Sequence, residues 1–116
     1  MKTTCHSESQ LERKFCKKIN ELGGMALKFV SPSQAGVPDR IILMPNGKIY
    51  FVEMKSPHGR IRPIQKYIFE KFEMLGFKVH VLNSEKSIEK FVGELVNDER
   101  NFSCKTLSRL CNKKNY

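Results

Sequence analysis

The stretch GVPDRIILMPNGKIYFVEMKS, residues 36–56, sets charged side chains beside the most apolar segments of the chain. Two runs within it, residues 39–44 and 48–55, are typical of β-strands. An Asn-Gly pair between two apolar runs is a strong hairpin signal, so we expect antiparallel strands joined at Asn46-Gly47. Charged groups avoid the protein interior unless they are paired or bind a metal. The charges at the open end of this hairpin therefore indicate a functional site.

Asp39, Glu53 and Lys55 are the charged residues at that open end. Side chains alternate faces along a strand, so Glu53 and Lys55 stand on the same face. Pairing back from the turn puts position 39 opposite roughly 54–55, which predicts that Asp39 lies close to both. This arrangement favours Mg²⁺ or Mn²⁺, which prefer oxygen ligands, with Asp39, Glu53 and the Met54 backbone carbonyl as ligands. Lys55 would orient a water or neutralise charge on a phosphate.

The same residues also allow a structural interpretation. Glu53 and Lys55 would then be a solvated ion pair, worth about 0–1 kcal/mol, and Asp39 would be a turn residue. A Glu-x-Lys spacing alone is usually of this kind. A Pro-Asp pair followed by a hairpin and Glu-x-Lys is more specific for a site.

Helical and strand patterns alternate along the chain. The expected elements are a helix over 8–22, strands over 25–30, 39–44 and 48–55, a helix over 62–75, a strand over 77–82 and a helix from Asn83 or Ser84 to about Val96. The expected apolar faces are Leu11, Phe15, Ile19 and Leu22, then Ile64, Ile68, Phe72 and Leu75, and finally Ile88, Val92 and Leu95. The order αβββαβα predicts a small α/β fold with a mixed sheet flanked by helices.

Length and composition suit one globular domain. The chain has 116 residues, 40% hydrophobic and 28% charged. We find no apolar run long enough to span a membrane and no secretory segment, so a cytoplasmic location is expected. Residues 1–96 are expected to form the domain, and 97–116 a basic tail or a short helix. The net charge of +9 favours a nucleic-acid partner, although a protein that is merely basic is an equal alternative.

The four cysteines show no metal-binding spacing. In a cytoplasmic chain they are expected to be free thiols; the alternative is a clamp that joins the two termini. They are Cys5, Cys16, Cys104 and Cys111.

GVPD at 36–39 with VEMK at 52–55 resembles the PD-(D/E)xK nuclease signature, and more narrowly the VRR-NUC family of virus-type replication-repair nucleases. The likeness covers about residues 7–92. Its pieces are ESQLE at 8–12, GGMALKFVSPSQAGVPDR at 23–40, FVEMKSPHGRIRPIQ at 51–65 and LGFKVHVLNS at 75–84. The resemblance implies a restriction-endonuclease-like core and a metal-dependent endodeoxyribonuclease. Its stand-alone phage-type members further imply a homodimer that cuts four-way (Holliday) junctions, in the host-cell cytoplasm if the chain is phage-encoded.

The resemblance also implies roles for particular residues. Asp39 and Glu53 match the metal ligands and Lys55 the catalytic lysine. Glu12 matches an acidic residue beside the metal, and Glu8, one helical turn earlier, is a weaker candidate. Gln65 matches a glutamine that would orient a water or a phosphate. From spacing alone, Glu12 would equally be a solvated surface residue and Gln65 an ordinary exposed helix residue.

Basic residues near the Glu-x-Lys segment are the expected DNA contacts. Lys and Arg bind phosphates without regard to sequence, and a helix N-terminus also favours anions. The expected contacts are His58, Arg60, Arg62 and Lys66, which follow that segment, and Lys28 of the first strand, which by the resemblance matches a recurrent family lysine. Solvated charge on an exposed loop is the alternative for the loop residues, and a surface strand residue is the alternative for Lys28.

Rival functions remain open from the sequence. If the protein is a nuclease, the alternative to junction cutting is a nicking or flap-type repair activity. Outside it, the alternatives are a catalytically silent DNA-binding module of the same fold and a small basic interaction protein whose motif match is accidental.

Overall fold

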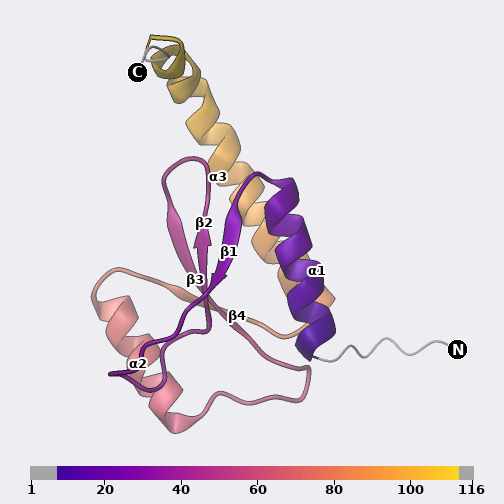
Figure 1. Ribbon diagram of the computed structural model, residues 1–116, viewed down its shortest axis with the longest axis vertical. Helices are drawn as coiled ribbons and strands as arrows, with labels where there is room; N and C mark the ends of the chain where they lie inside the picture. The colour runs from indigo at the N-terminus through magenta and orange to yellow at the C-terminus, as the bar shows by residue number, and fades with distance from the viewer. Residues whose placement is uncertain (1–7, 113–116) are drawn as a thin grey trace, which may run out of the picture.

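The computed structural model describes residues 8–112, with side chains described as far as residue 98. Its elements are α1 (Glu8–Glu21), β1 (Met25–Lys28), β2 (Arg40–Leu43), β3 (Ile49–Met54), α2 (Pro63–Met74), β4 (Val79–Leu82) and α3 (Glu85–Asn112), drawn in Figure 1. The predicted order αβββαβα is confirmed. Within the described residues, no helix is both long enough and apolar enough to cross a membrane.

The four strands form one mixed sheet in the order β1-β2-β3-β4. Strands β1, β2 and β3 are antiparallel neighbours, whereas β4 runs parallel to β3. A parallel neighbour requires a crossover connection, and α2 supplies it. The ends of β3 and β4 therefore lie side by side, where the Lys55 amide donates to the Leu82 carbonyl across 3.0 Å.

The register of the hairpin differs slightly from the expected one. Arg40 pairs with Val52, so Asp39 stands opposite Glu53 and not opposite 54–55. The predicted proximity of the two carboxylates holds, but the detailed pairing was wrong by one to two residues.

The hairpin loop explains this difference. The Met44 amide donates to the Lys48 carbonyl across 3.1 Å, which leaves a three-residue loop centred on Asn46. Gly47 has φ 79°, a left-handed conformation that costs glycine nothing. Glycine in that place is typical of a three-residue hairpin loop with a bulge. The expected pairing was counted from a two-residue turn at Asn46-Gly47, so the predicted partner of Asp39 was displaced along β3.

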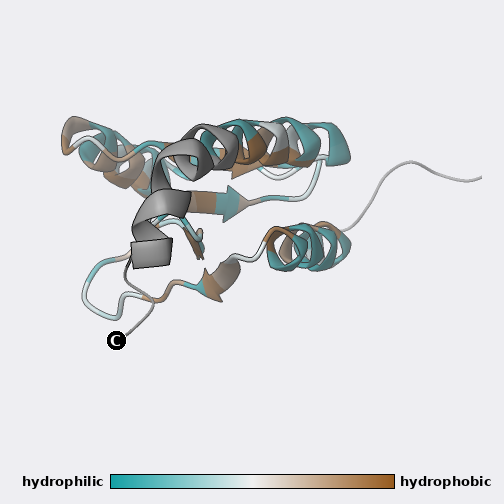
Figure 2. Cartoon of the chain, turned by 90° about the horizontal axis from the view of Figure 1, so that it is seen from above, coloured by the Kyte–Doolittle hydropathy of each residue, from teal (hydrophilic) through white to brown (hydrophobic). Residues whose placement is uncertain are grey.

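Helices α1 and α3 lie side by side against one face of the sheet, and α2 lies apart from them (Figure 1). The main core contains Leu11, Phe15 and Ile19 of α1, Ile42, Met44, Val52, Met54 and Leu82 of the sheet region, and Ile88, Phe91 and Leu95 of α3. On the other face, the Phe51 ring meets those of Phe72 and Phe77 at centroid distances of 5.1 and 5.7 Å. The helices are amphipathic, and Figure 2 shows hydrophilic and hydrophobic residues on each.

Two helix predictions need correction. Helix α2 buries Gln65, Ile68 and Phe69, whereas Ile64 and Leu75, both expected on its apolar face, are 40% and 75% exposed. Leu75 is the C-cap residue, one position beyond the end of α2 at Met74, and the buried position on the first turn is taken by Gln65. Helix α3 continues to Asn112 and does not end at about Val96. The domain boundary at residue 96 stays a prediction.

Of the four cysteines predicted to be free thiols, the structure describes the side chain of one. Cys16 is a free, partly buried thiol on α1. Cys5 and the side chains of Cys104 and Cys111 lie outside the described residues.

Candidate functional site

The open end of the β2–β3 hairpin links Asp39 and Glu53. The Asp39 amide donates to Oε1 of Glu53 across 3.2 Å, and Oδ1 of Asp39 accepts from the Met54 amide across 3.1 Å. Each carboxylate is thus fixed by the backbone of the opposite strand. The amide and the carbonyl of a strand residue face the same neighbour, so the Met54 carbonyl faces the Asp39 side of β3.

Gln65 connects α2 to Glu53. Its Nε2 donates to Oε2 of Glu53 across 2.8 Å, and its Oε1 accepts from the Arg62 amide across 3.0 Å. Gln65 is only 3% exposed, so it is not the ordinary exposed helix residue of the alternative. The two bonds fix the orientation of the amide and hold one oxygen of Glu53.

Lys55 gives Glu53 a positive partner. Its Nζ lies 3.2 Å from Oε2 of Glu53, and the two side chains are 16% and 5% exposed. A solvated surface pair does not fit this burial. A buried carboxylate requires compensation by charge and hydrogen bonds, and Glu53 receives it from Lys55, Gln65 and the Asp39 amide.

Helix α1 adds two carboxylates to this end of the sheet. One oxygen from each of Glu8, Glu12 and Asp39 lies within 4.8 Å of the others, a spacing suited to one shared cation. Residues four apart lie on the same side of a helix, which is why Glu8 and Glu12 both face the site. Glu12 and Asp39 are partly buried, whereas Glu8 is exposed.

The pKa of Asp39 is raised from 3.8 to about 6. The main cause is desolvation by burial, followed by repulsion from Glu53 and, more weakly, from Glu12. The hydrogen bond from the Met54 amide and the charge of Arg40 act in the opposite direction. A cation that binds beside Asp39 would stabilise its charged form, which burial and repulsion disfavour.

Arg40 belongs to the site and was not identified from the sequence. Its Nη2 lies 3.2 Å from Oε1 of Glu12, and its side chain is 10% exposed. One signal was available. Arg40 directly follows Asp39 and occupies a core-facing position of a short apolar strand, where an arginine needs a partner.

The expected DNA contacts are distributed around the site. His58, Arg60 and Arg62 lie in the loop between β3 and α2, and Lys66 follows on the first turn of α2; all four are exposed. Lys28 is exposed on the edge strand β1 and pairs with Arg40, so it lies on the α1 side of the sheet and not beside Lys55.

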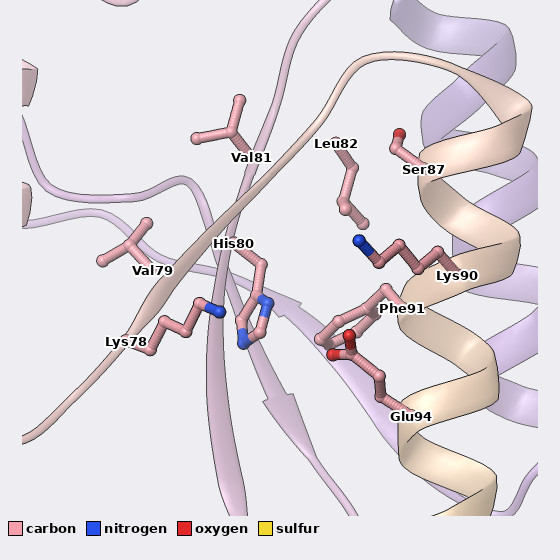
Figure 3. Close-up of a pocket in the computed structure, with 9 residues that line it drawn as sticks. All are labelled: Lys78, Val79, His80, Val81, Leu82, Ser87, Lys90, Phe91 and Glu94. Carbon is pink, nitrogen blue, oxygen red and sulfur yellow. The ribbon is translucent and has the colours of Figure 1, made fainter.

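A groove of about 270 Å³ between β4 and α3 shares none of these residues (Figure 3). His80 lies over Phe91 with ring centroids 4.7 Å apart. Burial, with a smaller contribution from Lys78, lowers the pKa of His80. The groove is therefore separate from the acidic centre at the hairpin end.

Comparisons with known proteins agree on one family. The model of the VRR-NUC domain matches residues 4–86. The chain is similar to "Putative nuclease p44" of Acyrthosiphon pisum secondary endosymbiont phage 1, with 42% identity over 78 residues, 67% of this chain and 84% of that protein. It is also similar to a solved structure described as a VRR_NUC domain, with a TM-score of 0.67 and 28% identity, covering 76% of this chain and 97% of that one.

Proposed function

This chain belongs to the VRR-NUC family, and from that premise we propose that it is a divalent-metal-dependent endonuclease that cuts branched DNA. The observation that carries the proposal is the convergence of Asp39, Glu53, Lys55 and Gln65 at one end of the sheet, linked by contacts of 2.8 to 3.2 Å. The similarity to a protein named as a nuclease supports the same activity. Because that protein is from a phage, we expect action in a host-cell cytoplasm.

The donor set fits a hard divalent cation. Carboxylate and carbonyl oxygens are the ligands that Mg²⁺ and Mn²⁺ prefer. Asp39, Glu53 and the Met54 carbonyl would hold the ion, and Glu12, with Glu8 beside it, adds negative charge at the same place. The raised pKa of Asp39 supports this fit, because a cation would offset both its main cause, desolvation by burial, and the repulsion from Glu53 that adds to it. When bound, the metal would polarise the phosphodiester and acidify a water.

The protein groups around Glu53 have separate tasks in this proposal. Lys55 presents an ammonium group at the edge of the acidic centre, where it would stabilise negative charge that develops on the phosphate or orient the attacking water. Gln65 fixes Glu53 through its Nε2 and is itself held by the Arg62 amide. The carboxylate is therefore preorganised before substrate arrives.

The exposed loop between β3 and α2 would hold the DNA backbone. It begins next to Lys55 and ends at the start of α2, where the positive end of the helix dipole favours phosphate. No sequence-reading motif lies there, so recognition would depend on backbone and shape. A homodimer, with two active sites related by a two-fold axis, would match the symmetry of a four-way junction. Light scattering that finds a monomer at assay concentration would contradict the dimer but not the nuclease.

We expect Arg60→Ala combined with Arg62→Ala to weaken DNA binding equally for all sequences. Each arginine removed would lose about one phosphate contact, so the negative slope of log K against log salt should become shallower by about 2. Fluorescence anisotropy of a labelled duplex across a salt series measures this slope.

The matched control is Lys86→Ala combined with Lys90→Ala on α3, which removes the same charge from exposed residues outside the loop. Its slope should change less. Equal changes in the two double variants would mean that net charge, and not this loop, determines binding.

The function is tested by cleavage of a labelled four-way junction and of a linear duplex with the same arms. Each substrate is incubated with Mg²⁺, with Mn²⁺ and with EDTA, beside the Glu53→Gln protein. Metal-dependent cutting of the junction that Glu53→Gln lacks would support the proposal. Equal cutting of both substrates would keep the nuclease and contradict branch selectivity. DNA binding without cutting would favour the silent DNA-binding module.

A further inference from the structure

Arg40 is a buried cation beside a group of carboxylates. It is 8% exposed, and its cross-strand neighbour Val52 is fully buried. Neighbours across a strand pair share one face of the sheet, so the arginine stem lies on the apolar side covered by α1 and α3. An arginine in such a place destabilises the fold unless its guanidinium is paired. Its partner is Glu12, at 3.2 Å.

Without Arg40, we expect the Glu12 side chain to rotate away from the site. Its side chain is 28% exposed, so rotamers that point toward water are accessible. Oxygens of Asp39 and Glu8 lie within 4.8 Å of its own, and like charges at this spacing repel. The guanidinium compensates the repulsion and holds one oxygen of Glu12 at a fixed place.

We propose that Arg40 is a positioning residue that holds Glu12 beside Asp39 and thereby raises the affinity of the site for its divalent metal. The inference rests on the proposed function. It also predicts that removal of Arg40 weakens metal binding, which is the opposite of what a simple charge effect predicts. A nearby cation repels a metal ion, so an arginine that only neutralised the carboxylates would weaken metal binding, and its removal would strengthen it.

The experiment is a calorimetric titration of the full chain with Mn²⁺, at one fixed neutral pH and without DNA. Arg40→Met keeps the length and apolar character of the stem and removes the guanidinium. It should weaken Mn²⁺ binding by about 10- to 100-fold, as changes to groups that orient metal ligands typically do. Arg40→Lys should recover part of this loss, because lysine keeps the charge but lacks the planar fork.

Two backgrounds test whether Arg40 acts through Glu12. In Glu12→Gln protein, adding Arg40→Met should weaken binding no further, because the carboxylate charge that Arg40 would hold beside Asp39 is already lost. In Glu8→Gln protein, a matched loss of one carboxylate, Arg40→Met should keep its full effect. Independent losses in the Glu12→Gln background would overturn the inference. So would unchanged or tighter Mn²⁺ binding by Arg40→Met alone.

The possible outcomes distinguish the role of Arg40 from the proposed nuclease function. Wild type that binds no Mn²⁺ would contradict both the nuclease proposal and the role of Arg40. Wild type that binds Mn²⁺ as tightly as Arg40→Met would contradict the role of Arg40 alone. Circular dichroism checks folding. If Arg40→Met does not fold, Arg40→Lys is used in its place. A loss of Mn²⁺ affinity in Arg40→Lys that disappears in the Glu12→Gln background supports the inference. Wild-type Mn²⁺ affinity in Arg40→Lys overturns it.

Discussion

Asp39→Asn is expected to abolish cleavage and, at the same time, to make the metal-free protein more stable at neutral pH. Asparagine has the shape of aspartate, and its Oδ1 can still accept the bond from the Met54 amide. It lacks the charge that would bind the metal. We expect the cleavage rate to fall on the order of 10³-fold or more, because loss of one member of a catalytic unit removes most of its effect.

The gain in stability follows from the pKa of Asp39. Its folded value of about 6 lies above the ordinary 3.8, so the folded state binds this proton more tightly than the unfolded chain does. The associated stability is complete below the unfolded pKa and is lost as the pH rises through the folded pKa. At neutral pH the charged group therefore destabilises the fold by at most about 3 kcal/mol, and Asp39→Asn removes that penalty.

Chemical denaturation in EDTA at about pH 4 and about pH 7.5 measures the effect. The stability gap between variant and wild type should be largest at the higher pH and small at the lower one. Asp98→Asn is the matched control, because Asp98 accepts from the Tyr50 hydroxyl and does not belong to the acidic centre. A variant that is less stable than wild type at neutral pH would give Asp39 a structural role.

Much of this site could be predicted from residues close together in the sequence. The hairpin brings Asp39 to Glu53, and the alternation of a strand brings Glu53 to Lys55. Both follow from local rules, and a loop longer by one residue shifted the register without separating the groups. Gln65 was placed near the site by the family resemblance, because its burial depends on how α2 packs against the sheet.

Arg40 could not be placed in the same way. Its role depends on Glu12, which is 28 positions away in the chain, and on the angle at which α1 crosses the sheet end. Periodicity indicates which face of α1 is buried, but not which carboxylate at the edge of that face meets a strand. The same limit applies to α2, where periodicity did not indicate that Gln65 is buried and bonded to Glu53.

Lys55→Met should separate catalysis from metal binding. The methionine keeps an apolar stem of similar length and removes the ammonium that lies 3.2 Å from Glu53. We expect the cleavage rate to fall by about 10²- to 10⁴-fold, the range for a group that transfers a proton or stabilises developing charge. Mn²⁺ binding should persist or become tighter, because a positive charge beside the ligands is lost. Asp39→Asn should instead lose metal binding and cleavage together.

Single-turnover cleavage and Mn²⁺ titration on the same Lys55→Met preparation make this comparison. Gln65 donates to Oε2 of Glu53, and we expect this bond to persist in the variant, so that the carboxylate keeps one of its partners. Lys86→Met, an exposed lysine on α3, controls for the loss of one charge and should cut at the wild-type rate. Wild-type cleavage by Lys55→Met would remove Lys55 from the mechanism and leave it as the counter-ion of Glu53. Loss of Mn²⁺ binding in that variant would show that Lys55 maintains the metal ligands and has no separate part in the chemical step.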